Sequence, residues 1–237
     1  MEVSTLDAYS TYLMALRWLH FVAGITWIGL LYFFNLVNVE FMKKLDGPTK
    51  GKVIPELMPR ALWWFRWGAV VTVLIGIMYY MSVLKDEPNM GSAIGIWFGV
   101  VLVTYAVIYA AFVPTSGPLN KGPILAIVVG LVVVIMMGIL IAMLGGPKVS
   151  SKSLSIALGG GLGVIMMLNV WGIIWPNQKR IIAWIAANAA QGTAIPPESA
   201  KLARQAFLAS RANFYLSFPM LFFMGAASHY PWIGFIK

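Results

Sequence analysis

The sequence contains no cysteine, and that absence removes several kinds of chemistry. Without thiols the chain cannot form a disulfide, ligate an iron–sulfur cluster, use a thiolate nucleophile or attach a c-type haem covalently. Charged residues are also scarce, at 11% of 237 residues, whereas a soluble domain typically carries about 25%. Hydrophobic residues make up 60% of the chain. This composition favours a membrane protein over a soluble globular enzyme.

The apolar residues gather into stretches long enough to cross a bilayer, which takes roughly 20 helical residues. We predict an all-α integral membrane protein, a bundle of about six transmembrane helices that forms a single membrane domain over 1–237. The spans are expected over about 13–36, 61–84, 92–113, 122–144, 154–175 and 209–230. A short amphipathic helix over about 178–190 is expected to lie along the inner membrane surface. Glycines at helical spacing, such as Gly95 and Gly161, are assigned to helix packing.

Acidic residues are absent from every predicted span, and all eight lie in loops or at span ends. Proton-driven transporters and ion pumps normally need a carboxylate within the membrane, so the pattern weighs against both classes. The residues before Arg17 include acids but no base, unlike the basic leader of a secretory signal. We therefore expect the first helix to be retained.

The excess of positive charge, +9 at neutral pH, lies mainly on one side of the predicted bundle. The positive-inside rule then places the basic loops in the cytoplasm and both chain ends outside, in a multi-pass protein of the bacterial inner membrane. Anionic membrane lipids explain these basic loops better than nucleic acid, which we do not expect as a partner. The basic side carries Lys43, Lys44, Lys50, Lys52, Arg60, Lys121, Lys179, Arg180, Lys201, Arg204 and Arg211, and the other side Lys85, Lys148, Lys152 and Lys237.

The two histidines are the candidate metal ligands. His20 lies in the first predicted span and His229 at the end of the last, both on the predicted extracytoplasmic side. Two imidazoles from different helices can hold a b-type haem without a covalent link. Arg17 shares a helix face with His20 and is suited to a haem propionate, and Gly24 would leave room for the macrocycle. The alternatives are an interfacial His229 that is simply hydrated and a His20 that bonds only to a neighbouring helix.

A second polar group is predicted near the inner side of the membrane. It consists of Asn35, Asn38, Arg66 and Asn169. These side chains could line a pocket for a quinone or another small molecule, or they could satisfy helix ends and each other. No side chain is assigned a catalytic role.

Four segments resemble the membrane domain of bacterial membrane-bound urate oxidase (urate hydroxylase). They read RWLHFVAGITWIGLLYFFN at 17–35, WFRWGAVVTVLIG at 64–76, MMLNVWGIIWPNQKR at 166–180 and NFYLSFPMLFFMGAASHYP at 213–231. The resemblance implies a domain that is normally joined to a C-terminal cytochrome c domain, with electrons flowing to the periplasmic side. This chain ends at Lys237 and has no cysteine for haem c, so we expect another polypeptide to supply the cytochrome.

Three functions remain open at this point. The first is an electron-transfer subunit that holds one b-type haem and exchanges electrons with a separate c-type cytochrome or another respiratory-complex subunit. The second is a urate-oxidase-like oxidoreductase completed by a partner cytochrome, with Arg17 or Arg66 binding an anionic purine. The third is a cofactor-free structural subunit of a membrane complex, held together through its glycine-rich helix faces.

Overall fold

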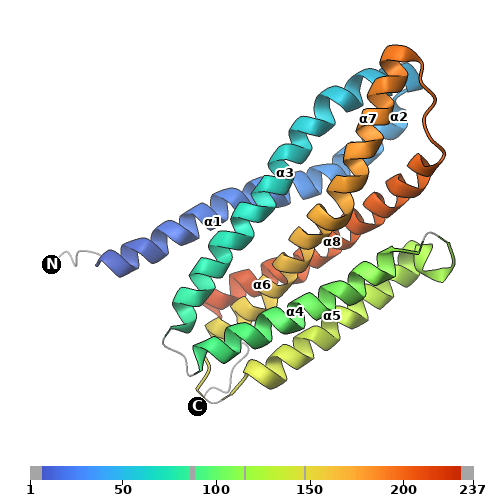
Figure 1. Cartoon of the computed structure of the whole chain (residues 1–237). Helices are drawn as coiled ribbons and strands as arrows, with labels where there is room; N and C mark the ends of the chain where they lie inside the picture. Colours follow the sequence, from blue (N-terminus) through green and yellow to red (C-terminus); the bar gives the residue numbers. More distant parts are fainter. Residues whose placement is uncertain (1–6, 86–88, 115, 147, 231–237) are drawn as a thin grey trace.

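The computed structural model describes residues 7–85, 89–114, 116–146 and 148–230, and within them the protein is helical without a strand. Figure 1 shows the helices as a bundle in which α1 and α3 cross and α4 and α5 form an adjacent pair. In chain order the elements are α1 (Ala8–Tyr32), the π-helix η1 (Phe33–Asn38), α2 (Val39–Lys44), α3 (Gly47–Leu84), α4 (Met90–Phe112), the 3-10 turn η2 (Pro118–Asn120), α5 (Gly122–Leu144), α6 (Ser151–Asn169), the π-helix η3 (Val170–Ile174), α7 (Trp175–Gln191) and α8 (Glu198–His229).

Within the described residues, five helical segments are long and apolar enough to cross a membrane, and the prediction of an all-α fold is confirmed. They are Ala8–Lys44, Gly47–Leu84, Met90–Phe112, Gly122–Leu144 and Ser151–Gln191. The sixth predicted span lies in α8, which has 32 residues but buries polar side chains such as Asn213 and Ser217. The count of six spans stays a prediction. So does the position of the chain ends, because residues 1–6 and 231–237 lie outside the described part.

The amphipathic segment 178–190 is helical and is part of a longer helix. It belongs to α7, which continues α6 through η3 as one helix from Ser151 to Gln191. In Figure 1 this helix runs beyond the α4–α5 pair, and α7 packs against α3 and α8. Its half-buried face therefore meets neighbouring helices, and its position along the inner membrane surface stays a prediction.

Two π-helical segments interrupt the long helices, and each has a local cause. In η1 the amide of Asn35 donates to the carbonyl of Leu31 at 2.9 Å, so a side chain enters the main-chain hydrogen-bond ladder. After η3 comes Pro176, which has no N–H and whose ring would collide with the carbonyl of Gly172 in a regular helix. The wider π turn relieves this conflict and lets the helix continue.

The ends of the bundle are identified by contacts between distant parts of the chain. At one end, the Tyr9 hydroxyl donates to the carbonyl of Ser82 at 2.9 Å, and Arg17 donates to Ser228 at 3.3 Å. We call this the His229 end. At the other, the α7 end, Gln205 donates to the carbonyl of Phe112 at 3.3 Å, which sets the start of α8 beside the end of α4.

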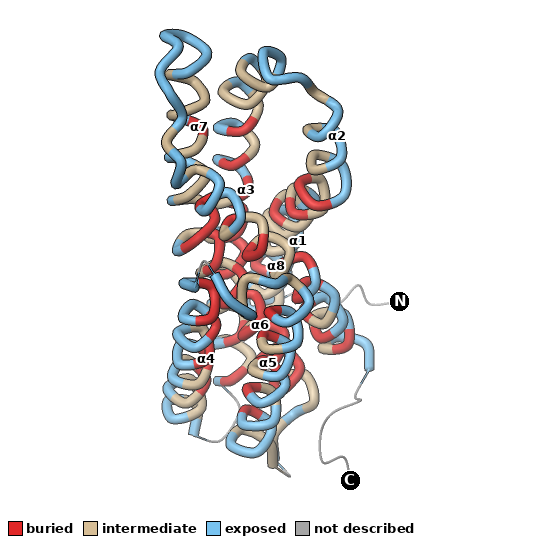
Figure 2. Tube along the Cα trace, turned by 90° about the vertical axis from the view of Figure 1, so that its right-hand side faces the viewer, coloured by how far each residue is buried: buried red, intermediate tan, exposed pale blue. Residues whose placement is uncertain are grey.

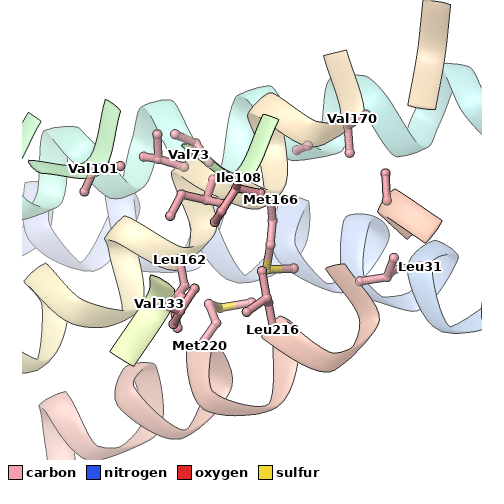
Figure 3. Close-up of a cluster of buried hydrophobic side chains, with 14 of the residues drawn as sticks. Leu31, Val73, Val101, Ile108, Val133, Leu162, Met166, Val170, Leu216 and Met220 are labelled. Atoms are coloured by element: carbon pink, nitrogen blue, oxygen red, sulfur yellow. The ribbon is translucent and has the colours of Figure 1, made fainter. Parts of the chain in front are cut away.

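The core surrounds α6, nearly all of which is buried among α3, α4, α5 and α8. Figure 2 shows buried residues through the middle of the bundle and exposed ones around the tips of α2, α3 and α7. In Figure 3, apolar side chains from separate helices meet at one centre. The labelled members are Leu31, Val73, Val101, Ile108, Val133, Leu162, Met166, Val170, Leu216 and Met220.

Glycine allows α6 and α8 to approach closely. A Cβ atom at Gly159 would lie 3.0 Å from the Cβ of Phe223 and 3.2 Å from the carbonyl oxygen of Met220. At Gly161 it would lie 3.1 Å from a methyl group of Val101, so the packing role predicted there is confirmed. A Cβ at Gly95 would meet nothing within 4 Å among the described residues, so this glycine allows no close helix approach within them, and a role in packing against another subunit stays a prediction.

We expect Gly159→Ala to lower the free energy of unfolding by about 1–3 kcal/mol, because the added methyl group overpacks the crossing of α6 and α8. Gly95→Ala is the matched control and should leave stability unchanged or slightly raised, since alanine favours a helix and space is open there. Chemical unfolding of both variants in detergent measures the difference. Equal losses in the two variants would contradict this account of the crossing.

Candidate functional site

A cavity of about 430 Å³ lies between α1, α3, α6 and α8. This size falls within the range of small-molecule and cofactor pockets. Its wall is largely apolar, with aromatic side chains and several glycines. The glycines are Gly24, Gly29, Gly76, Gly159, Gly160 and Gly163, and polar groups come from Arg17, His20, Tyr32, Thr72 and Ser228.

His20 is the only imidazole in the lining of this cavity, and a hydrogen bond fixes its ring. Its Nδ1 lies 2.9 Å from the main-chain carbonyl oxygen of Thr72 on α3. A carbonyl can only accept, so we assign the proton to Nδ1, which leaves the lone pair on Nε2 free. Histidines that bind metal typically hold the other ring nitrogen in this way, on a carbonyl or a carboxylate. This hydrogen bond therefore orients the ring and leaves Nε2 as the unprotonated nitrogen.

Gly76 provides the space that this imidazole occupies. A Cβ atom at residue 76 would lie 3.0 Å from Cε1 and 3.3 Å from Nδ1 of His20. The hydroxyl of Thr72 does not compete for the ring, because it donates to the carbonyl of Gly68 at 2.7 Å. The main chain of α3 thus fixes the ring position in two ways. The Thr72 carbonyl accepts a hydrogen bond from the ring, and Gly76 has no side chain to occupy the same space. This role of Gly76 could not be predicted from the sequence, since Gly76 lies in an ordinary apolar span.

The structure brings three of the four predicted haem contacts to this cavity. Arg17, His20 and Gly24 all line it, and Gly24 is in ordinary contact with the methyl group of Thr72 at 3.7 Å. The guanidinium of Arg17 donates to the hydroxyl of Ser228 at 3.3 Å, which places a positive charge where α1 meets the end of α8. The positive charge is therefore at the exposed edge of a largely apolar cavity.

His229 is at the same end of the bundle but outside the cavity lining. It is the last residue of α8, it is exposed, and its ring lies 6.5 Å from that of Tyr230. Its neighbour Ser228 does line the cavity. The two histidines thus come from the predicted helices and lie at the same end, although only His20 reaches the cavity.

Tyr32 forms the inner limit of the cavity, and sequence reasoning missed it. Its hydroxyl lies 3.1 Å from that of Ser217 on α8, and its ring packs edge-on against Phe214 at 5.3 Å. These contacts link α1 to α8 below the cavity. A tyrosine flanked by apolar residues offered no signal of this role.

The inner polar group does not line this cavity, and two of its members bridge helices. Asn35 donates to the hydroxyl of Ser210 at 3.0 Å, and Asn169 donates to the side-chain oxygen of Asn213 at 2.9 Å. Each bond joins α8 to another helical segment. Such bonds match the possibility that these side chains satisfy each other rather than line a pocket. The side-chain oxygen of Asn38 is enclosed without a partner.

Arg66 differs from the asparagines of this group because its side chain contacts aromatic rings. Its guanidinium carbon lies 3.7 Å from the centre of the Trp175 ring and 5.8 Å from that of Trp171. It takes part in none of the three ion pairs found among the described residues.

We expect Gly76→Ala to displace the His20 ring and weaken its bond to the Thr72 carbonyl, because the new methyl group would overlap the imidazole. Nitrogen-15 spectra of histidine-labelled protein should then show loss of the single Nδ1-protonated form of one of the two histidines. Gly29→Ala is the control, since Gly29 lines the same cavity but has open space at the Cβ position. An unchanged His20 spectrum in Gly76→Ala would refute the proposed positioning.

Comparison with known families gives one match. Residues 47–235 match the model of the urate oxidase N-terminal family. The matched part includes Thr72, Gly76 and His229, whereas Arg17 and His20 precede it. No curated protein and no solved structure matches the chain. Because the family match covers well over half of the sequence, from α3 through α8, this chain belongs to the urate oxidase N-terminal family.

Proposed function

We propose that the chain is a membrane-embedded electron-transfer subunit that binds one b-type haem in the cavity, with His20 as an axial ligand. One observation carries the proposal: Nδ1 of His20 is held by the Thr72 carbonyl, so Nε2 is the nitrogen free to bind iron. The same bond fixes both the tautomer and the direction of the ring.

The residues of the cavity fit a haem by their chemistry. His20 is a single imidazole, so a metal here needs most of its ligands from another source, and a porphyrin brings four nitrogens of its own. A flat apolar ring suits walls formed by glycine and aromatic side chains. The guanidinium of Arg17, at the exposed edge, suits a propionate. Arg17 is thus the propionate contact, and Gly24 and Gly76 keep space beside the ligand.

A bound haem would supply one-electron transfer, and the chain would control its environment. The Thr72 carbonyl keeps the proton on Nδ1 and makes His20 a stronger ligand. Packing between α1, α3, α6 and α8 limits water around the site. His229, at the same end of the bundle but outside the cavity lining, would be the candidate for a second imidazole to hold the haem.

The proposed setting is the bacterial inner membrane, crossed six times, with both chain ends and the cavity on the extracytoplasmic side. The basic residues of α2, α7 and the start of α8 support this orientation through the positive-inside rule. A cavity near the outer surface suits electron exchange with a separate c-type cytochrome or another respiratory subunit.

The absorbance spectrum of the purified protein tests the proposal. We expect a reduced-minus-oxidised difference spectrum typical of haem b, and we expect His20→Ala to abolish it, since it removes the positioned imidazole. His229→Ala is the companion variant: a changed spectrum with haem retained would identify His229 as the second ligand. A colourless, iron-free preparation of the intact protein would exclude this function and favour the cofactor-free structural subunit.

Membership of the urate oxidase family favours one further candidate, a urate-oxidase-like oxidoreductase completed by a partner cytochrome. Arg17 is then the residue to bind an anionic purine at the edge of the cavity. Membranes that contain the chain should consume urate only when an electron acceptor is supplied, and Arg17→Gln should raise KM more than it lowers kcat. No turnover with any supplied cytochrome would exclude this candidate.

A further inference from the structure

We infer that Arg66 binds an oxyanion, the phosphate group of a membrane lipid, at the α7 end of the bundle. Arg66 lies on α3, outside the lining of the cavity that contains His20. The inference therefore stands independently of the proposed haem.

The guanidinium of Arg66 is held in place by two tryptophans on successive turns of the α6–η3–α7 helix. It stacks on Trp175, with its carbon 3.7 Å from the ring centre, and Trp171 lies beside it at 5.8 Å. The indole N–H of Trp171 also donates to the main-chain carbonyl of Arg66 at 3.3 Å. The cation is thus fixed in orientation before any ligand arrives, which lowers the entropic cost of binding.

The charge of Arg66 has no anionic partner within the described residues. The three ion pairs there join Lys43 to Glu40, Arg60 to Glu56 and Arg180 to Glu198. Two of the guanidinium nitrogens, Nε and Nη1, are enclosed and donate to nothing. Arginine stays protonated in proteins, so this group cannot relieve the cost by losing its proton. The third guanidinium nitrogen, Nη2, is not among these enclosed atoms, so it is the donor that an anion from outside the chain can reach. Such an anion would lower the cost of the unpaired charge.

The position of Arg66 along the bundle indicates where that anion comes from. The Tyr105 hydroxyl donates to the Leu168 carbonyl at 3.0 Å, and Trp171 contacts Arg66 three residues later. Since α4 ends at Phe112, seven residues after Tyr105, Arg66 lies within about two turns of the end of α4. This is the depth at which a span ends and lipid headgroups begin.

The side chains around Arg66 have the character of a membrane interface. Trp63, Trp64 and Trp67 are 46%, 59% and 42% exposed, and they flank Arg66 on α3. Exposed tryptophans are enriched at the level of lipid headgroups. A guanidinium stacked on an aromatic ring presents its N–H edge to a phosphate, an arrangement that a lysine cannot reproduce. The combination selects an anionic phosphate at the bilayer edge, so we assign the site to a phospholipid headgroup.

Native mass spectrometry of the full chain, delipidated and then titrated with phosphatidylglycerol, tests the site. We expect Arg66→Gln to weaken lipid retention by about tenfold or more, as loss of a charge-assisted hydrogen bond implies. Arg60→Gln is the matched control: Arg60 is an exposed arginine on the same helix, already paired with Glu56, and its loss should change retention less than twofold. Equal retention in Arg66→Gln and the wild type would overturn the site.

A second variant and a second probe separate the alternatives. Arg66→Lys keeps the charge without the planar stack, so retention should fall at least threefold while the protein still folds; retention at the wild-type level would overturn the inference. Inorganic phosphate is the other probe. If millimolar phosphate releases the bound phosphatidylglycerol and binds Arg66 equally well, the site belongs to a soluble anion and the lipid assignment fails. No release by phosphate supports the lipid headgroup.

Discussion

The hydrogen bond from His20 to the carbonyl of Thr72 sets the geometry on which the candidate site depends. It crosses from α1 to α3, fixes the tautomer of the only imidazole in the cavity, and requires glycine at residue 76. Nearby, a Cβ at Gly68 would lie 3.4 Å from the main-chain nitrogen of Trp27, so the two helices approach closely along their crossing. The contacts that pack α1 against α3 therefore also fix the orientation of the His20 ring.

The sequence was informative where apolar length decides the structure and less so where one side chain decides it. Runs such as 122–144 predicted helices of bilayer length, because only a helix satisfies its own backbone in lipid. The helix over 178–190 was predicted but its continuity with α6 was not, since an amphipathic pattern suits a bundle face as well as a membrane surface. The role of Gly76 was missed because a glycine that makes room for a ring from another helix looks like any other glycine. The open space around Gly95 was not predicted for the same reason.

The residues of the inner polar group have similar polarity but make different kinds of contact in the structure. Asn35 and Asn169 each find a partner on α8, so their polarity serves to hold helices together. Arg66 contacts aromatic rings and pairs with no acid among the described residues. In sequence all three were simply polar residues near the end of a span. Only the three-dimensional arrangement separates the side chains that bond within the protein from the one whose charge points to a ligand outside it.

The continuous helix from Ser151 to Gln191 has a consequence for how the protein meets its surroundings. At 41 residues it is about 60 Å long, roughly twice the thickness of a bilayer core. A single crossing of a bilayer core would use about half of this helix, and the rest would extend from the bundle beside α3 and α8. A macromolecule that contacts this extension would act directly on the helix at the centre of the bundle, because α6 and α7 are continuous.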